Sequence, residues 1–112
     1  MNKVLLVWNV SKAQELKKTN SDSDVITLRI ATNETIKRGD QNENETTFHT
    51  CVFWNHLARY ASTFEAGDIV AIEGKLKSRE YVDKKDIKRY VTEIYVEKVK
   101  MISKKANRNP SN

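Results

Sequence analysis

The side chains of this chain best suited to chemistry are aromatic rings and cations that share one face of an expected strand in each of two stretches. Residues 46–54 have strand composition, and alternation along a strand places Phe48 and Trp54 on one face, about 20 Å apart. Residues 75–81 repeat the pattern with cations, because one face of that stretch carries Lys75, Lys77, Arg79 and Tyr81. Rings can stack on bases and cations can neutralise phosphates, so both faces are candidate binding surfaces for a polyanion such as nucleic acid.

The charge distribution also points to a polyanionic partner. The 112 residues carry a formal net charge of +5, to which residues 1–74 contribute −2 and residues 75–112 contribute +7. Lys84 and Lys85 belong to this basic second half. Nucleic acid is the first candidate partner and an anionic membrane the second, while a solvated lysine-rich surface explains the charge alone equally well.

Catalytic and metal-binding functions find little support. His49 and His56 have no Ser, Cys or carboxylate partner at a convincing spacing, and Asp83 and Asp86 flank a lysine pair as turn residues do. One cysteine, Cys51, and two histidines cannot supply a zinc or iron–sulfur ligand set. We therefore expect no enzymatic activity, cofactor or metal, and the single cysteine suits the reducing cytoplasm.

A structural role is the alternative for each aromatic residue. On the residues alone, Phe48 and Trp54 fit a hydrophobic core as well as a binding face, whereas Tyr81 stands among cations and is harder to bury. The opposite face of residues 46–54 carries His49, Cys51 and Phe53. Of these, Phe53 suits the core, and Cys51 suits a small buried apolar position rather than a nucleophile.

Five strands and one helix are expected to position these side chains. A helical pattern covers residues 56–64 after Asn55, a residue type that caps helices. Strand patterns cover residues 3–8, 25–32, 46–54, 69–82 and 88–102. Gly67 suits the C-terminal cap of the helix, Gly74 suits a bulge, and a change of alternation near Lys98 predicts a second bulge.

The segments between these elements are polar. Residues 33–45 predict a long hairpin loop that is disordered at its tip, and residues 19–24 predict a turn. Five strands with one helix between the third and fourth are typical of the OB-fold, an all-β Greek-key barrel that binds oligonucleotides or oligosaccharides. We expect one domain, residues 1–102, and a polar, disordered tail, residues 103–112, with no membrane-spanning segment.

Seven short motifs follow one another in a characteristic order and spacing. They are MNKVLLVWN at 1–9, ATNE at 31–34, TFH at 47–49, LA at 57–58, GD at 67–68, IEGKL at 72–76 and RYVTEI at 89–94. As a set they resemble bacterial single-stranded DNA-binding proteins over roughly residues 1–102. The resemblance implies an OB-fold protomer that assembles with itself, as a homotetramer with a dimer as the alternative, and binds single-stranded DNA without sequence preference.

The resemblance also implies roles for individual residues. Phe48, Trp54 and Tyr81 correspond to positions where the family stacks bases, and Ile36 occupies a fourth such position without a ring. Two cations, Lys77 and Arg79, correspond to basic positions of the family. The basic pattern adds three more to the expected DNA path, namely Lys75, Lys84 and Lys85.

Two departures from the family and one matching histidine concern assembly and recruitment. Trp8 replaces a family glycine, and we expect it to fill a core or subunit contact; His49 corresponds to a histidine near a subunit contact. The acidic tail with which family members recruit other proteins has no counterpart in residues 104–112. Recruitment through such a tail is therefore not expected.

The first functional hypothesis is sequence-independent binding and protection of single-stranded DNA during replication, recombination or repair. The alternative is a primosomal-type or mobile-element OB-fold protein that bridges replication proteins and binds DNA weakly, which the missing acidic tail and Ile36 favour. An OB-fold that reads structured RNA or oligosaccharide fits the fold and little else.

Overall fold

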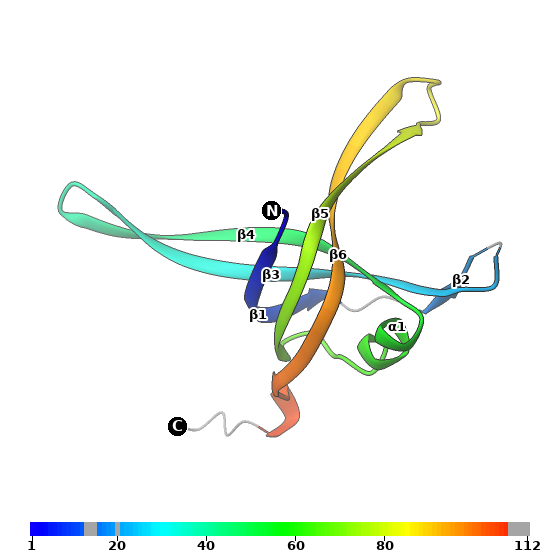
Figure 1. The fold of residues 1–112 in the computed structure, drawn as a ribbon. Coiled ribbons are helices and arrows are strands. Elements are labelled where there is room, and N and C mark those ends of the chain that lie inside the picture. The colour runs from blue at the N-terminus through cyan, green and yellow to red at the C-terminus, as the bar shows by residue number, and fades with distance from the viewer. Residues whose placement is uncertain (13–15, 20, 108–112) are drawn as a thin grey trace.

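A computed structural model describes residues 1–12, 16–19 and 21–107 (Figure 1). This part of the chain is almost entirely β-structure with one short helix. The elements in chain order are β1 (Val4–Lys12), β2 (Lys17–Lys18), β3 (Asp24–Arg38), β4 (Gln41–Trp54), α1 (His56–Ala61), β5 (Ile69–Val82), β6 (Lys88–Ser103) and the 3₁₀ turn η1 (Lys105–Asn107).

The strands form one sheet in the order β1-β5-β6-β4-β3-β2. A further pairing of β1 with β3, which begins at Asn9 and Ala31, closes five of the strands into a barrel. The two-residue β2 lies outside the barrel on the edge of β3. Closure between β4 and β6 is parallel, whereas the other pairings are antiparallel. The all-β OB-fold with one helix between the third and fourth barrel strands is thus confirmed.

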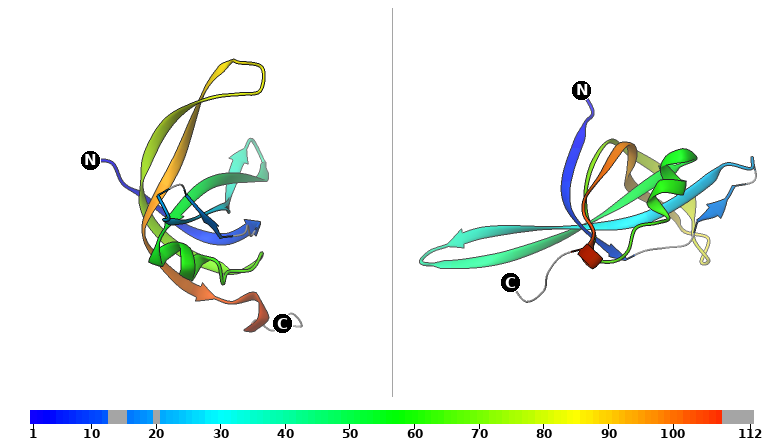
Figure 2. Two further views of the ribbon diagram at one scale, coloured as in Figure 1. Left: turned by 90° about the vertical axis from the view of Figure 1, so that its right-hand side faces the viewer. Right: turned by 90° about the horizontal axis from the view of Figure 1, so that it is seen from below.

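The hydrophobic core follows from the alternation along these strands. In β3, Ile26, Leu28 and Ile30 are buried, and the facing residues of β4 include the buried Cys51 and Phe53. Helix α1 packs against β3, β4 and β6 at one end of the barrel (Figure 2). Beyond the helix, the ring of Phe64 meets that of Phe53 edge-on, with centroids 6.4 Å apart.

Two hairpins extend from the barrel, and the first corrects a sequence prediction. Residues 33–45 are not a long loop: β3 and β4 remain paired from Val25–Trp54 to Arg38–Gln41, and only Gly39 and Asp40 form the turn (Figures 1 and 2). Gly39 has a φ of 63°, which suits the first central position of a two-residue hairpin turn. The polar composition reflects exposure of both faces of this hairpin.

The irregularities predicted at Gly74 and near Lys98 are confirmed and are one feature. Glu73 pairs with Lys98 and Gly74 with Val96, so β6 carries one extra residue, Glu97, between them. The backbones approach closely here, because a Cβ built on Gly74 would collide with the carbonyl oxygen of Tyr95. Another register shift lies between Ile69 and Val70.

Both predicted helix caps are wrong in part. Asn55 occupies the N-cap position, but its φ is 53° and its side chain makes no cap hydrogen bond. Its backbone N–H instead donates to the Asp24 carbonyl oxygen at 2.8 Å, which connects the start of the helix to β3. The helix ends at Ala61 with Ser62 as its right-handed C-cap, so Gly67, with a φ of 97°, serves a later turn.

The chain after the last strand also differs from the prediction of a disordered tail. Ser103 ends β6, and residues 105–107 form η1. The buried Asp68 carboxylate accepts hydrogen bonds from the Lys105 amide at 2.8 Å and the Lys104 ammonium at 3.2 Å, which fixes this segment to the barrel. Residues 108–112 lie outside the described residues. No helix of the described part is long and apolar enough to cross a membrane.

Candidate nucleic-acid interface

The ring and cation side chains of residues 46–54 and 75–81 lie on the outer face of the same sheet. The parallel pairing sets Val52 of β4 beside Tyr95 of β6, and the antiparallel pairing sets Tyr95 opposite Lys75 of β5. Neighbouring residues in register share a face. The face that begins with Phe48 and Trp54 on β4 therefore continues across β6 to the cations and Tyr81 on β5.

A groove of about 270 Å³ lies where β4 and β6 meet on this face. Trp54 and Tyr95 bring their rings together there, with centroids 6.3 Å apart and planes inclined by 53°. The groove is lined by Val25, Thr27, Val52, Trp54, Arg79, Glu93 and Tyr95. The arrangement offers an apolar, ring-walled surface beside a charged pair, which suits a planar base with polar edges.

The charged pair in the groove is Arg79 with Glu93. The Nε atom of Arg79 donates to Oε1 of Glu93 at 2.8 Å, and the Glu93 side chain is only 7% exposed. The carboxylate accepts this hydrogen bond and favours the guanidinium cation, which raises the pKa of Arg79. Arg79 therefore neutralises a buried acid while 52% of its own side chain stays exposed.

Phe48 is an exposed ring rather than a core residue. Its side chain is 49% exposed, and the Arg29 guanidinium carbon lies 4.9 Å from the ring centroid. A cation beside an exposed ring suits both a phosphate and the base attached to it. Sequence reasoning missed Arg29, because its contact with Phe48 depends on the pairing of β3 with β4.

Tyr81 and the lysine pair lie on the second hairpin, away from the groove. Tyr81 is 45% exposed, and Arg79 lies 5.7 Å from its ring centroid. It pairs with Arg89, six residues before Tyr95 on β6 and so about 20 Å from it. Lys84 and Lys85 are exposed in the turn of that hairpin (Figure 1).

The turn of the second hairpin is built by its aspartates, as predicted. The Asp83 carboxylate accepts the amides of Lys85 and Ile87 at 2.9 and 3.0 Å. The amide of Ile87, and then the Arg89 side chain, hold the pKa of Asp83 below its ordinary value. Asp86 has a φ of 61°, a turn conformation. These groups position the lysines rather than form an acid–base pair.

The opposite face of β4 belongs to packing. Cys51 is fully buried, and burial raises the pKa of its thiol to about 12, so it is no nucleophile at neutral pH. Phe53 is fully buried in the core, as predicted. His49 is half-buried, and its Nε2 lies 2.9 Å from the Thr32 hydroxyl.

The structure differs from expectation at Ile36, which the resemblance places among the stacking positions, and at Trp8, for which a core position was one alternative. Ile36 pairs with Glu43, which places it on the His49 side of the first hairpin and not with Phe48. Trp8 is 40% exposed on β1, so it does not fill the core of this chain. Its subunit-contact alternative stays a prediction.

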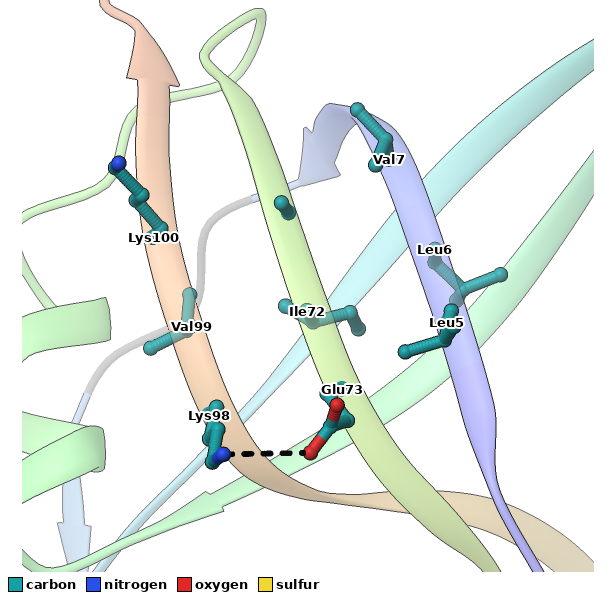
Figure 3. Close-up of a pocket in the computed structure, with 9 residues that line it drawn as sticks. Leu5, Leu6, Val7, Ile72, Glu73, Lys98, Val99 and Lys100 are labelled. Carbon is teal, nitrogen blue, oxygen red and sulfur yellow. Dashed lines mark ion pairs between the residues drawn. The ribbon is translucent and has the colours of Figure 1, made fainter.

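A second, apolar groove of about 390 Å³ lies over β1, β5 and β6 (Figure 3). Leu5 and Val7 of β1 stand at its edge with 68% and 58% of their surface exposed. Glu73 and Lys98 border it and pair at 3.9 Å between Oε2 and Nζ. The surface is apolar enough for protein contact and carries few groups for nucleic acid.

A family model described as the single-strand binding protein family matches residues 1–102. The chain belongs to the single-strand binding protein family. It is 35% identical over 109 residues to a single-stranded DNA-binding protein of Bacteroides thetaiotaomicron, covering 94% of this chain and 68% of the relative. It is 32% identical over 112 residues to single-stranded DNA-binding protein 1 of Xylella fastidiosa, covering 97% and 82%. Single-stranded DNA-binding protein 3 of Listeria innocua is 34% identical over 108 residues, which cover 96% and 67%.

Membership of the single-strand binding protein family confirms the resemblance read from the seven motifs. Alternation in the sequence correctly placed four residues on one face of β5, namely Lys75, Lys77, Arg79 and Tyr81. It missed Tyr95 because nothing in the sequence shows that β6 lies between β4 and β5.

Proposed function

We propose that this single-strand binding protein coats and protects single-stranded DNA in the cytoplasm during replication, recombination or repair, without reading base sequence. The observation that carries the proposal is one shared outer face, which carries the rings of Phe48 and Trp54 on β4 and the cations and Tyr81 of β5. Ring faces stack on any base, and cations release counterions from phosphates, so neither interaction selects a sequence. The chemistry needs no catalytic group, metal or cofactor.

Along the proposed path the rings contribute base stacking and the cations contribute phosphate neutralisation. Phe48, Trp54 and Tyr81 supply stacking surfaces, each worth about 1–3 kcal/mol by substitution. Five side chains of β5 and its turn supply positive charge, namely Lys75, Lys77, Arg79, Lys84 and Lys85. The alternative of a bridging protein with weak DNA binding is not favoured, since the relatives are named for single-stranded DNA binding.

Titration with oligo-dT, followed by tryptophan emission, tests the function directly. We expect strong quenching at low salt, because Trp54 lies on the DNA path, and binding that weakens steeply as salt rises. Replacing Lys75 or Lys77 with Gln should reduce the slope of log K against log salt by about 0.7 each. Lys100→Gln, beside the apolar groove, is the matched control and should leave the slope unchanged. Absence of quenching at low salt would sink the proposal.

We further propose that the protein assembles with itself, as a homotetramer or else a dimer. The exposed Leu5 and Val7 form an apolar surface on β1 that a second copy can cover, and Trp8 and His49 are the other candidate contacts. Light scattering after size exclusion tests this. We expect Val7→Glu to lower the mass of the assembly, and an unchanged mass would remove β1 from the interface.

A further inference from the structure

The two halves of the proposed DNA path are not adjacent in the sheet. Phe48 and Trp54 lie on β4, whereas Lys75 to Tyr81 lie on β5, and β6 runs between these strands. A nucleic acid strand that contacts both halves must therefore cross β6. At the crossing, where β6 pairs with β4, the outer face of β6 presents Glu93 and Tyr95.

Tyr95 holds the central position of this crossing. It is half-buried, beside Val52 of β4 and opposite Lys75 of β5. Its ring lies 6.3 Å from that of Trp54, with the planes inclined by 53°, and both rings line the groove. The two rings thus give a single base two apolar contacts instead of one.

Glu93 does not block the crossing, although a carboxylate repels phosphate. Arg79 holds it at 2.8 Å, and its side chain is only 7% exposed. The exposed member of the pair is Arg79, with 52% of its side chain exposed. The strand therefore meets a cation above the buried acid.

We propose that Tyr95 is a base-contacting residue of this interface, and that one unpaired base sits in the groove against Trp54 and Tyr95 where the DNA passes from β4 to β5. The inference rests on the proposed function and adds a ring to the path, in place of the one that Ile36 lacks. The ligand is a single nucleobase of any identity, since the contacts are ring faces.

The test uses the full chain, oligo-dT and three variants at one salt concentration. Tyr95→Leu should weaken binding by about 5-fold to about 100-fold, the range for loss of one base stack, with the salt slope unchanged. Tyr95→Phe keeps the ring and should bind as the parent protein does. Tyr90→Leu is the matched control, because Tyr90 lies on the same strand, pairs with Glu80 and is 72% exposed on the other face.

A double-mutant cycle shows whether the two rings serve one base. The losses from Trp54→Leu and Tyr95→Leu should be less than additive, because both act on the same base. The losses from Trp54→Leu and Phe48→Leu should add, since Phe48 lies about 20 Å from Trp54 along β4. Additive losses for Trp54 and Tyr95 would contradict a shared base.

The outcomes separate this inference from the proposed function. If the parent protein does not bind oligo-dT, the function itself fails. If it binds and Tyr95→Leu binds equally, or Tyr95→Phe loses as much as Tyr95→Leu, only the role of the Tyr95 ring fails. Should Tyr95→Leu not fold, photocrosslinking of the parent protein to 5-iododeoxyuridine oligonucleotides decides. Crosslinks at Tyr95 support the inference, and crosslinks confined to Phe48, Trp54 and Tyr81 overturn it.

Discussion

The guanidinium of Arg79 donates to both carboxylate oxygens of Glu93, at 2.8 Å from Nε and 3.5 Å from Nη2. The acid is buried and its partner is half-exposed. The cation therefore has two roles, because it satisfies a largely buried carboxylate and it presents positive charge to a ligand. Substitutions on the two sides of the pair should separate these roles.

Arg79→Met should weaken both stability and DNA binding. The unfolding free energy should fall by about 1–3 kcal/mol, because the largely buried Glu93 carboxylate loses its hydrogen-bond partner. Adding Glu93→Gln should restore much of the stability and none of the phosphate contact. Urea unfolding and oligo-dT titration measure the two effects. A double variant as unstable as Arg79→Met alone would contradict this account of the pair.

Tyr81→Leu should weaken binding of oligo-dT by about 5-fold to about 100-fold, because it removes one exposed stacking surface. The neighbouring Val82→Ala should leave affinity unchanged, since Val82 is 59% exposed on the other face of the same strand. Fluorescence titration at fixed salt compares the two variants. Equal losses would show that the hairpin matters only as a whole.

Asp68 should make stability depend on acid pH. Burial acts to raise the pKa of its carboxyl, but the amides of Glu65 and Lys105 and the Lys104 ammonium outweigh it, so the pKa lies below its ordinary value. A depressed folded-state pKa gives stability that is present above the unfolded value of about 4 and is lost as pH falls through the folded value.

Asp68→Asn should therefore lower stability at neutral pH and flatten the decline of unfolding free energy below about pH 4. Urea unfolding at a series of pH values measures both effects. Asp40→Asn, exposed in the turn of the first hairpin, is the control and should follow the parent curve. Parallel curves for Asp68→Asn and the parent protein would exclude Asp68 as a source of the acid sensitivity.

Gly74→Ala should destabilise the barrel by about 1–3 kcal/mol, because the added methyl group would collide with the Tyr95 carbonyl. Since the backbone of Tyr95 must move, DNA binding should weaken as well. Gly39→Ala is the comparison: nothing lies within 4 Å of its Cβ, but its φ of 63° carries a cost of about 1 kcal/mol. Thermal unfolding should show a stability loss for both variants. Titration with oligo-dT should show a loss of affinity for Gly74→Ala only.

Local patterns in the sequence were sufficient for most of the fold. Ile26, Leu28 and Ile30 alternate with polar residues, and the structure buries all three. The failure at residues 33–45 has a physical cause. A hairpin that projects into solvent has no buried face, so its strands carry Glu, Asn and Thr and lack the apolar alternation of a barrel strand.

The site was predictable strand by strand but not as a whole. Alternation alone put Phe48 with Trp54 and Lys77 with Arg79. The order of strands in the sheet, however, depends on long-range pairing, and short motifs carry no information about it. Tyr95 therefore looked like one more strand residue, although the sheet places it between the two halves of the path.

The parallel pairing of β4 with β6 is short. Among the described residues, β4 and β6 are in register only at Cys51–Ile94 and Val52–Tyr95, whereas β3–β4 and β5–β6 pair along their length. Short parallel pairing makes this junction the first place for the barrel to open, and its backbone amides the first there to exchange with solvent. A base that rests against Trp54 and Tyr95 would bridge the junction from outside. Bound DNA would then stabilise the β4–β6 junction against local opening and slow amide exchange at Cys51 and Val52.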